Sequence, residues 1–147
     1  MGRLTGKIAV ITGGVSGIAR GIVEMYVEEG AKVIVADIQA QNGAEIERHF
    51  PGSVYFSACD IRNEDDIART MAMAEEKFGG LDIVVHAAAS VDHKQKIVDL
   101  TTEAWDDGQA NLLRSHVMCI KHAVAPMERR GGGSVVRDDA AAGRAVE

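Results

Sequence analysis

Short runs of apolar residues alternate with helical patterns along the whole chain. The apolar runs cover residues 7–12, 32–37, 53–60, 81–87 and 133–136, and most of them are continuous rather than interrupted by polar positions. Continuous runs of this length are typical of strands that are covered on both faces of a parallel sheet. We therefore predict five buried parallel strands.

Four helices are predicted between these strands. The first places Ile18, Ile22 and Met25 on one face, and Gly30 stands where a C-terminal cap is expected. The second covers about residues 40–49. Each helix connects two successive strands, as crossovers in a parallel sheet require.

The third helix begins after Asn63, a favourable N-cap residue, and acidic residues fill its first turn, at the positive end of the helix dipole. The fourth is the longest and runs from about Thr102 to Arg129. Its apolar stripe consists of Leu113, Val117, Ile120 and Val124. Pro126 is expected to bend or end it in its last turn.

This alternation predicts an α/β fold of the Rossmann type, a doubly wound parallel sheet with strand order 3-2-1-4-5. A ligand then binds at the carboxyl ends of the strands, near the switch between the first and fourth strands. The length of 147 residues and the absence of repeats favour one domain.

A glycine-rich turn follows the first strand. The stretch "TGGVSGIA", Thr12 to Ala19, leads from that strand into a helix. Gly13 and Gly17 allow a tight turn and a close approach of a pyrophosphate, whose charge meets the first N–H groups of the helix. Such a turn also serves purely steric needs, so its position in the βαβ unit matters.

An acidic residue, Asp37, ends the second strand twenty residues after Gly17. Its carboxylate can accept hydrogen bonds from the ribose hydroxyls of a dinucleotide, and it would repel a 2'-phosphate. Val15, Ser16 and Ile38 offer no cation for such a phosphate. We therefore predict NAD(H) rather than NADP(H), although Asp37 alone could also be a polar residue that terminates a strand.

Charge and cysteine content narrow the class of partner. The net charge is -6 and no run of Lys or Arg occurs, which argues against a nucleic-acid partner. The first fourteen residues contain only a short apolar run interrupted by glycines, so we expect neither a signal peptide nor a membrane anchor. Cys59 and Cys119 lie sixty residues apart, which suggests buried, reduced thiols in a cytoplasmic protein.

Taken together, these motifs resemble the N-terminal part of the short-chain dehydrogenase/reductase family. Thr12, Gly13 and Gly17 match the family's TGxxxGxG turn, and Asp37 matches its acidic residue after the second strand. The resemblance covers about residues 4 to 136. It implies a partial NAD-binding Rossmann domain over residues 1–136, without the further strands and helices of the full fold, and an off-family, disordered tail over residues 137–147.

The resemblance also implies roles for individual residues. "CDI" resembles the motif that would put Asp60 beside the adenine amino group, and "LDIVVHAAAS" resembles the LDxLVNNAG stretch at the nicotinamide end. Asn111 falls on the catalytic asparagine, the relay position of the family. The cofactor-binding residues implied are Thr12, Gly13, Ser16, Gly17, Ile18, Asp37, Asp60, Ile61, His86, Ala87 and Ala88.

Several positions depart from the family pattern. Ala19 replaces the last glycine of the turn, His86 replaces the first asparagine of the fourth-strand motif, and Ala89 replaces its glycine. His86 is expected near the nicotinamide, either as a catalytic acid or base or as a structural histidine. The five histidines lack the HxxxH and HExxH spacings of metal sites, so no metal is predicted.

The largest departures concern the catalytic groups. Ala140 falls on the catalytic serine, and neither Tyr26 nor Tyr55 is followed by the lysine of a YxxxK motif. In the family, that tyrosine transfers a proton to or from the substrate oxygen while a hydride moves to or from the nicotinamide. We therefore expect a chain truncated before this motif and catalytically inactive.

Three hypotheses follow for the function. The first is a truncated form of an NAD-dependent oxidoreductase that acts on an alcohol or carbonyl substrate, with a homo-oligomer as one option for its assembly. The second is a non-catalytic module that binds NAD(H) or docks onto a partner through an open helix face. The third is a shortened enzyme to which another chain supplies the tyrosine and lysine.

Overall fold

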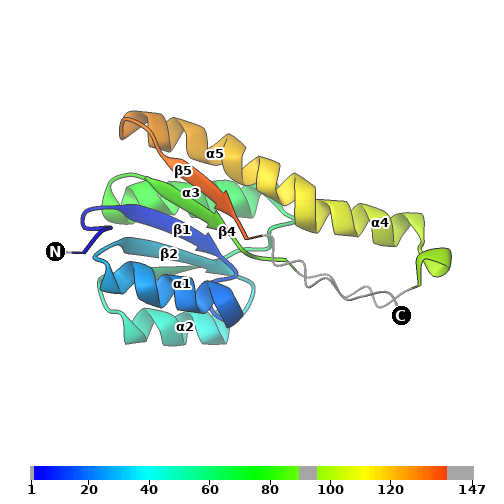
Figure 1. Ribbon diagram of the computed structural model, residues 1–147, viewed down its shortest axis with the longest axis horizontal. Coiled ribbons are helices and arrows are strands. Elements are labelled where there is room, and N and C mark those ends of the chain that lie inside the picture. The colour runs from blue at the N-terminus through cyan, green and yellow to red at the C-terminus, as the bar shows by residue number, and fades with distance from the viewer. Residues whose placement is uncertain (1, 90–95, 139–147) are drawn as a thin grey trace.

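A five-stranded parallel sheet forms the centre of the molecule, shown in Figure 1. The computed structural model describes residues 2–89 and 96–138. The strands are β1 (Ile8–Thr12), β2 (Lys32–Asp37), β3 (Val54–Ala58), β4 (Ile83–His86) and β5 (Ser134–Arg137). Their order is β3-β2-β1-β4-β5. The α/β fold and the strand order that the sequence predicts are therefore confirmed.

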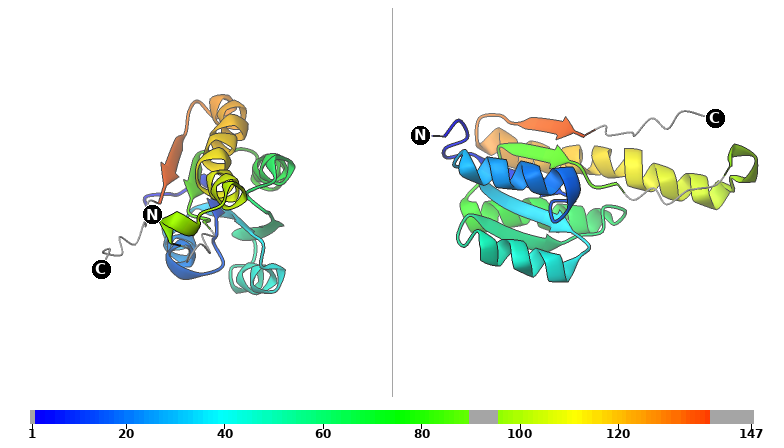
Figure 2. Two further views of the ribbon diagram at one scale, coloured as in Figure 1. Left: turned by 90° about the vertical axis from the view of Figure 1, so that its right-hand side faces the viewer. Right: turned by 60° about the horizontal axis from the view of Figure 1, so that its bottom comes forward.

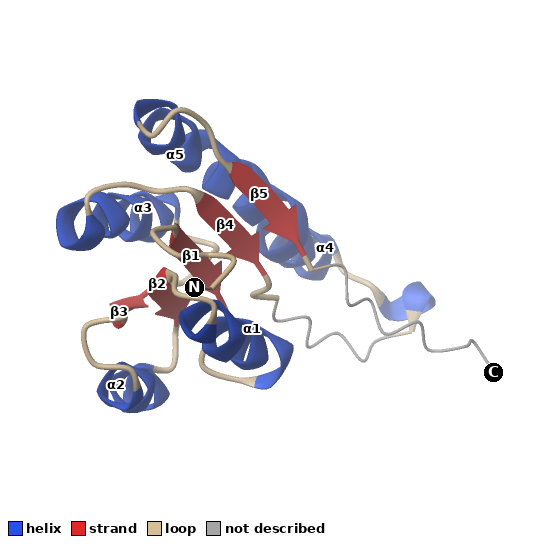
Figure 3. Ribbon diagram, turned by 60° about the vertical axis from the view of Figure 1, so that its left-hand side comes forward, coloured by secondary structure: helices blue, strands red, loops and turns tan. Residues whose placement is uncertain are grey.

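Helices cover both faces of this sheet. The helical segments are α1 (Gly17–Glu28), α2 (Ala40–His49), α3 (Glu64–Phe78), the 3-10 turn η1 (Ile97–Asp99), α4 (Thr102–Gln109), the π-helical turn η2 (Ala110–Arg114) and α5 (Ser115–Arg129). Figure 3 shows α1 and α2 on one side of the sheet and α3 and α5 on the other. Within residues 2–89 and 96–138, no helix combines the length and the hydropathy needed to cross a lipid bilayer.

Two apolar cores lie on the two faces of the sheet. Val23 of α1 and Ile46 of α2 pack in one core, with members that include Ile11, Val33 and Val35. Cores on both faces explain why the strands are continuously apolar, since successive side chains of a strand point to opposite faces. The opposite core includes Val10, Ile34, Ile67, Met71, Val84, Cys119 and Met127.

The third helix begins as the sequence predicts. The Asn63 side chain accepts a hydrogen bond of 2.9 Å from the Asp65 amide, and the first turn of α3 is acidic. Gly79 ends the helix with a left-handed backbone, at φ 87°. Local capping chemistry therefore places the start of α3 where the sequence predicts it, and a glycine cap, which the sequence analysis did not single out, ends the helix.

The long fourth helix departs from the predicted single α-helix. Figure 2 shows α4, η2 and α5 as one continuous rod that extends past the carboxyl ends of the strands. Its middle turn, η2, is π-helical, and Pro126 lies inside α5, which continues to Arg129. The predicted apolar stripe is exposed: Leu113 by 54%, Val117 by 47%, Ile120 by 38% and Val124 by 45%. The face on the sheet is instead lined by small residues, Ser115, Cys119 and Ala123.

Candidate functional site

A cavity of about 630 Å³ opens at the carboxyl ends of the strands, where the fold places a ligand. Nine of the twelve predicted site residues line it: Gly13, Ser16, Gly17, Ile18, Asp37, Ile61, Ala87, Ala88 and Asn111. The remaining three, Thr12, Asp60 and His86, are not among its walls. The structure therefore brings most of the predicted residues together and assigns the others to different contacts.

Two glycines shape the turn between β1 and α1. Gly13 has a φ of 73°, and a Cβ atom on it would stand 3.0 Å from the Ala88 Cα. Gly17 also has a positive φ, 57°, but a Cβ atom there would meet no atom within 4 Å. Crowding therefore favours glycine at position 13, whereas open space beside Gly17 leaves room for a ligand group.

The amino end of α1 is suited to an anion. Ser16 is the N-cap residue, and its side chain makes no capping hydrogen bond. The first helical hydrogen bond runs from the Arg20 amide to the Ser16 carbonyl, so the preceding amides of Gly17, Ile18 and Ala19 have no intrahelical partner. The first turn contains no acidic residue. Free amides at the positive end of a helix dipole are suited to an anion such as a phosphate group.

Asp37 is held at the end of β2 by the residue two positions later. Its Oδ1 accepts hydrogen bonds from the Gln39 amide at 3.1 Å and from Gln39 Nε2 at 3.4 Å. Both bonds fall on the same oxygen, which leaves Oδ2 outside this pair of contacts. Asp37 is 7% exposed, and it lines the cavity beside the uncharged Ile38 and Gln39.

Thr12 stabilises one wall of the cavity without lining the cavity itself. Its side chain is buried, and Oγ1 accepts hydrogen bonds from the amides of Ala87 at 3.1 Å and Ala88 at 3.0 Å. Because Ala87 and Ala88 line the cavity, Thr12 ties the end of β1 to the wall that follows β4. A direct contact with the ligand is not needed for this role.

Asp60 is engaged in an ion pair. Arg62 Nη2 lies 2.9 Å from Asp60 Oδ2, and Arg62 Nη1 lies 3.3 Å from Asp107 Oδ1. The hydrogen bond from the Arg62 side chain lowers the pKa of the Asp60 carboxyl. Cys59 and Ile61, the neighbours of Asp60, line the cavity instead.

Asn111 reaches the cavity from the π-helical turn. It is 3% exposed, and its Nδ2 donates to the Asp107 carbonyl at 3.1 Å and to Asp107 Oδ2 at 3.3 Å. π-Helical turns inside α-helices are frequent at functional sites. The structure thus places Asn111 on the cavity wall, on an unusual turn that the sequence pattern did not indicate.

His86 points away from the cavity, toward α5. Its Nε2 lies 3.0 Å from Ser115 Oγ, and its ring makes an edge-on contact with His116. Burial, together with the nearby charges of His116 and Arg137, lowers the pKa of His86 to about 4. A neutral, buried imidazole in this place fits the structural histidine better than the acid or base.

Further residues line the cavity without having been predicted: Ala19, Ile38, Gln39, Cys59, Ala89 and Asp138. The Asp138 amide donates to the His86 carbonyl at 3.1 Å, which extends the pairing between β4 and β5. Asp138 could have been predicted from its position directly after the fifth strand, because the carboxyl ends of all parallel strands meet at one edge of the sheet. Ala140, the predicted serine position, lies outside the described residues.

The thiols and the metal-binding residue types add no further chemistry to the site. Burial raises the pKa of Cys59, and it raises that of Cys119 to about 12, so both thiols stay protonated near neutral pH. In the described part of the chain, no group of three or more His, Cys, Asp or Glu residues is arranged to hold a metal ion. The site is therefore characterised by its amides, Asp37 and Asn111.

Comparison with protein families gives one matching profile, described as "Enoyl-(Acyl carrier protein) reductase", over residues 13–147. This match includes residues 137–147, most of which lie outside the described residues, so their predicted separation as an off-family tail stays a prediction.

Curated relatives are similar over nearly the whole chain. Short-chain dehydrogenase reductase 3a of Arabidopsis thaliana is 35% identical over 136 residues, which are 91% of this chain and 53% of that protein. 2,5-Dichloro-2,5-cyclohexadiene-1,4-diol dehydrogenase of Sphingobium indicum is 33% identical over 97% of this chain and 58% of its own length. D-Xylose 1-dehydrogenase of Caulobacter vibrioides is 35% identical over 90% and 53%, respectively. The chain spans about half the length of the curated relatives it matches.

Proposed function

This chain belongs to the short-chain dehydrogenase/reductase family, and we propose that it is the NAD(H)-binding part of an oxidoreductase that acts on an alcohol or carbonyl compound. The observation that carries this proposal is the position of the α1 amino end and of Asp37 on one cavity. An anion site and a carboxylate on the same cavity suit the pyrophosphate and the adenosine ribose of a dinucleotide.

The residues fit the pyrophosphate at the glycine turn. Gly17 leaves open space beside the unpaired amides of Ile18 and Ala19, and no carboxylate of the first turn competes for them. Ser16 lines the cavity with a hydroxyl that takes no part in capping. We infer that these groups bind the pyrophosphate and orient the cofactor.

The preference for NAD(H) over NADP(H) rests on charge. Asp37 would repel a 2'-phosphate, and the described residues that line the cavity include no Lys or Arg. Arg20, the cation next to the glycine turn, is already paired with Glu24 at 3.1 Å and approaches Glu45 at 3.7 Å. A 2'-phosphate would therefore meet a carboxylate without a compensating cation.

The reacting end of the cofactor would lie toward Ala88, Ala89 and Asn111. NAD(H), when bound, supplies or accepts the hydride. Asn111 can orient a water or a polar group there, but among the 147 residues no tyrosine is followed by lysine at the YxxxK spacing. We propose that these residues alone bind the cofactor and do not complete proton transfer to a substrate.

Titration of the purified chain with NADH and NADPH, followed by nucleotide fluorescence, tests the cofactor proposal. We expect weak binding of NADH and weaker binding of NADPH. Asp37→Asn keeps the shape of the side chain and removes its charge, so the preference should fall by about tenfold, or roughly 1.4 kcal/mol. Glu76→Gln is the matched control, since it removes one exposed charge on α3 that pairs only with neighbouring Lys77 among its described contacts.

The outcomes are distinct. Tight binding of NADPH by the unaltered chain would contradict the cofactor assignment, and a folded chain that binds neither nucleotide would contradict the site. Hydride transfer between NAD and a panel of alcohols, detected by NADH absorbance, would contradict the proposed inactivity of these residues. Binding without turnover is the expected result.

A further inference from the structure

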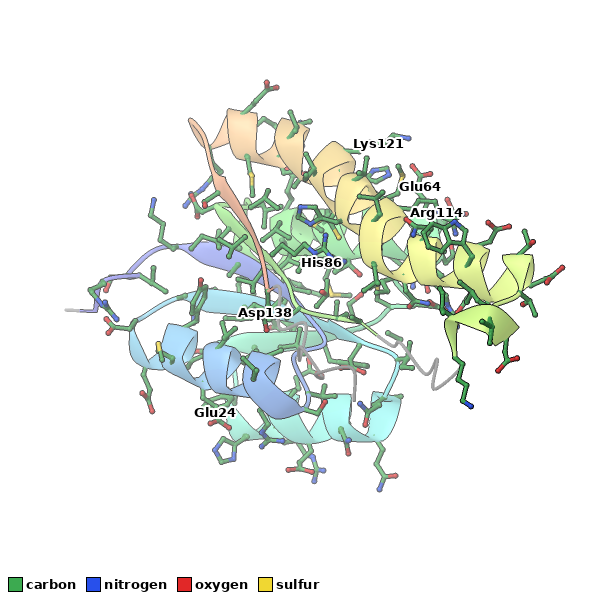
Figure 4. All side chains as sticks on the ribbon, turned by 45° about the vertical axis from the view of Figure 1, so that its right-hand side comes forward. Glu24, Glu64, His86, Arg114, Lys121 and Asp138 are labelled. Atoms are coloured by element: carbon green, nitrogen blue, oxygen red, sulfur yellow. The ribbon has the colours of Figure 1, made fainter. Side chains whose placement is uncertain are left out.

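A buried hydrogen-bond chain connects the end of β4 to the turn that carries Asn111. His86 and Ser115 are 3% and 1% exposed, and His86 Nε2 lies 3.0 Å from Ser115 Oγ. Figure 4 labels His86 beneath the helix that contains Ser115. Two polar side chains are thus paired in the core between the sheet and α5.

Ser115 replaces a backbone hydrogen bond that the π-helical turn removes. In an α-helix its amide would donate to Asn111, four residues earlier. Here the amide donates to the Ala110 carbonyl, five residues earlier, and the Ser115 hydroxyl donates to the Asn111 carbonyl. The Ser115 side chain therefore bonds the carbonyl that the Ser115 amide would bond in a regular α-helix.

The direction of these bonds assigns the proton on His86. A serine hydroxyl has one hydrogen and two acceptor positions. Because Ser115 donates to the Asn111 carbonyl, it must accept from His86, whose Nε2 then carries a hydrogen. Burial keeps the His86 ring neutral, so only one of its two nitrogens carries a hydrogen. We assign this hydrogen to Nε2, which donates it to the Ser115 hydroxyl.

We propose that His86 and Ser115 are positioning residues that hold the π-helical turn and so keep Asn111 on the wall of the cofactor cavity. This inference deepens the proposed function and rests on it for its consequence, the orientation of Asn111 toward NAD(H). The structural part, stabilisation of the turn by the side-chain pair, stands on the contacts alone.

The same arrangement of hydrogen bonds occurs once more in the described part of the chain, on a regular α-helix. Thr70 of α3 donates to the Asp66 carbonyl four residues earlier, and Ser57 of β3 lies 2.8 Å from its Oγ1. By the same count of hydroxyl hydrogens, Ser57 donates to Thr70. A buried donor from a strand thus supports a hydroxyl on a helix in both places, but only Ser115 compensates for a π-helical turn.

This parallel supplies a matched control. Ser115→Ala removes the hydroxyl that satisfies the Asn111 carbonyl, whereas Ser115→Thr keeps it. Ser57→Ala removes a buried donor that, like His86, comes from a strand and supports a helix hydroxyl, but at a place with no π-helical turn. Differences between Ser115→Ala and Ser57→Ala therefore separate positioning of Asn111 from a general loss of core hydrogen bonding.

The experiment uses the full 147-residue chain and nuclear magnetic resonance. In the unaltered chain, the ring nitrogens of His86 should show a hydrogen on Nε2 and none on Nδ1. Ser115→Ala should shift the side-chain amide signals of Asn111 and raise the exchange rates of backbone amides 114–116 by about tenfold or more. Ser115→Thr should restore both, and Ser57→Ala should leave both unchanged.

NADH affinity gives the second measurement. Ser115→Ala should weaken NADH binding several-fold, and Ser115→Thr should restore it. If the unaltered chain binds no NADH, the proposed function fails while the spectra still decide the role of the pair. Unchanged Asn111 signals in Ser115→Ala, equal effects of Ser57→Ala, or a hydrogen on Nδ1 of His86 would each overturn the inference.

Discussion

Gly13 lies against Ala88 so closely that a Cβ atom on Gly13 would stand 3.0 Å from the Ala88 Cα. The turn after β1 and the segment after β4 therefore approach each other closely where both line the cavity. This contact joins two segments that lie far apart in the chain and both line the proposed cofactor site.

Gly13→Ala should therefore destabilise the fold. The new Cβ atom would be crowded against Ala88. The alanine would also have to adopt a φ of 73°, which non-glycine residues rarely adopt. We expect a loss of about 1–3 kcal/mol in the free energy of unfolding, measured by urea denaturation. Gly21→Ala in α1, where a Cβ atom meets nothing within 4 Å, should instead stabilise the protein by about 0.5–1 kcal/mol.

Thr12 should be sensitive to loss of its hydroxyl. Thr12→Val keeps the shape but leaves the amides of Ala87 and Ala88 without their acceptor. We expect a loss of about 2 kcal/mol, because unsatisfied buried donors cost about 1–3 kcal/mol each and these two amides are only partly buried. NADH binding should weaken as well. Thr12→Ser keeps the oxygen and should retain most of both properties; equal losses in the two variants would contradict this role.

Protonation of His86 should make the fold sensitive to mild acid. Its pKa is about 4 in the folded state against an ordinary value of 6.5, so the unfolded chain takes up the proton first as pH falls. Stability is complete above about pH 6.5 and declines toward pH 4, by up to about 1.4 kcal/mol for each unit. Between pH 6.5 and 5, urea denaturation should show a loss of roughly 1.5 kcal/mol.

Variants separate this effect from other titrating groups. His86→Asn removes the titrating ring from its contacts with Ser115, His116 and Arg137, and it should flatten the decline in that pH range. His49→Gln, which alters an exposed histidine at the end of α2, should leave the decline unchanged. A slope that persists in His86→Asn would show that another group is responsible.

Asp82 should contribute more to stability than the exposed ion pairs do. Its Oδ2 accepts from the Ile8 amide at 2.9 Å and from Arg130 Nη2 at 3.0 Å. Burial opposes ionisation of Asp82, but the Arg130 guanidinium and the Ile8 amide outweigh it and lower the pKa of the carboxyl. Asp82→Ala should cost about 2–4 kcal/mol, somewhat less than a fully buried pair, since Arg130 is 35% exposed.

Glu75 supplies the comparison for Asp82. It forms two hydrogen bonds of 2.8 Å with Arg129, whose side chain is 59% exposed. Glu75→Ala should therefore cost less than about 1 kcal/mol by the same denaturation measurement. Similar losses in the two variants would show that burial of Asp82 does not set its contribution.

Most elements of the fold could be predicted because they depend on neighbours in the chain. The apolar runs, the Asn63 cap and the glycine turn act within a few residues, and each was confirmed where it was expected. The π-helical turn could not be predicted, since its hydrogen bonds depend on Ser115 and on a histidine from another element. No short sequence pattern predicts the π-helical turn.

The apolar stripe of the long helix illustrates a second limit. Leu113, Val117 and their neighbours predicted a helix, but the face that packs on the sheet carries Ser115, Cys119 and Ala123. Small side chains can approach the sheet closely, so the more hydrophobic face is not the buried one here. Figure 4 shows Glu64 of α3 near Lys121, and the two side chains form an exposed ion pair at 2.7 Å on that helix.

For this protein, the order of strands and helices, the amino end of α1 and the place of Asp37 followed from local sequence patterns, because hydrophobic periodicity and turn chemistry act over short distances. The engagement of Asp60 by Arg62, the pairing of His86 with Ser115 and the presentation of Asn111 depended on contacts across the fold. Side-chain direction in those places is set by sheet register and helix packing, which bring together residues that are distant in the chain.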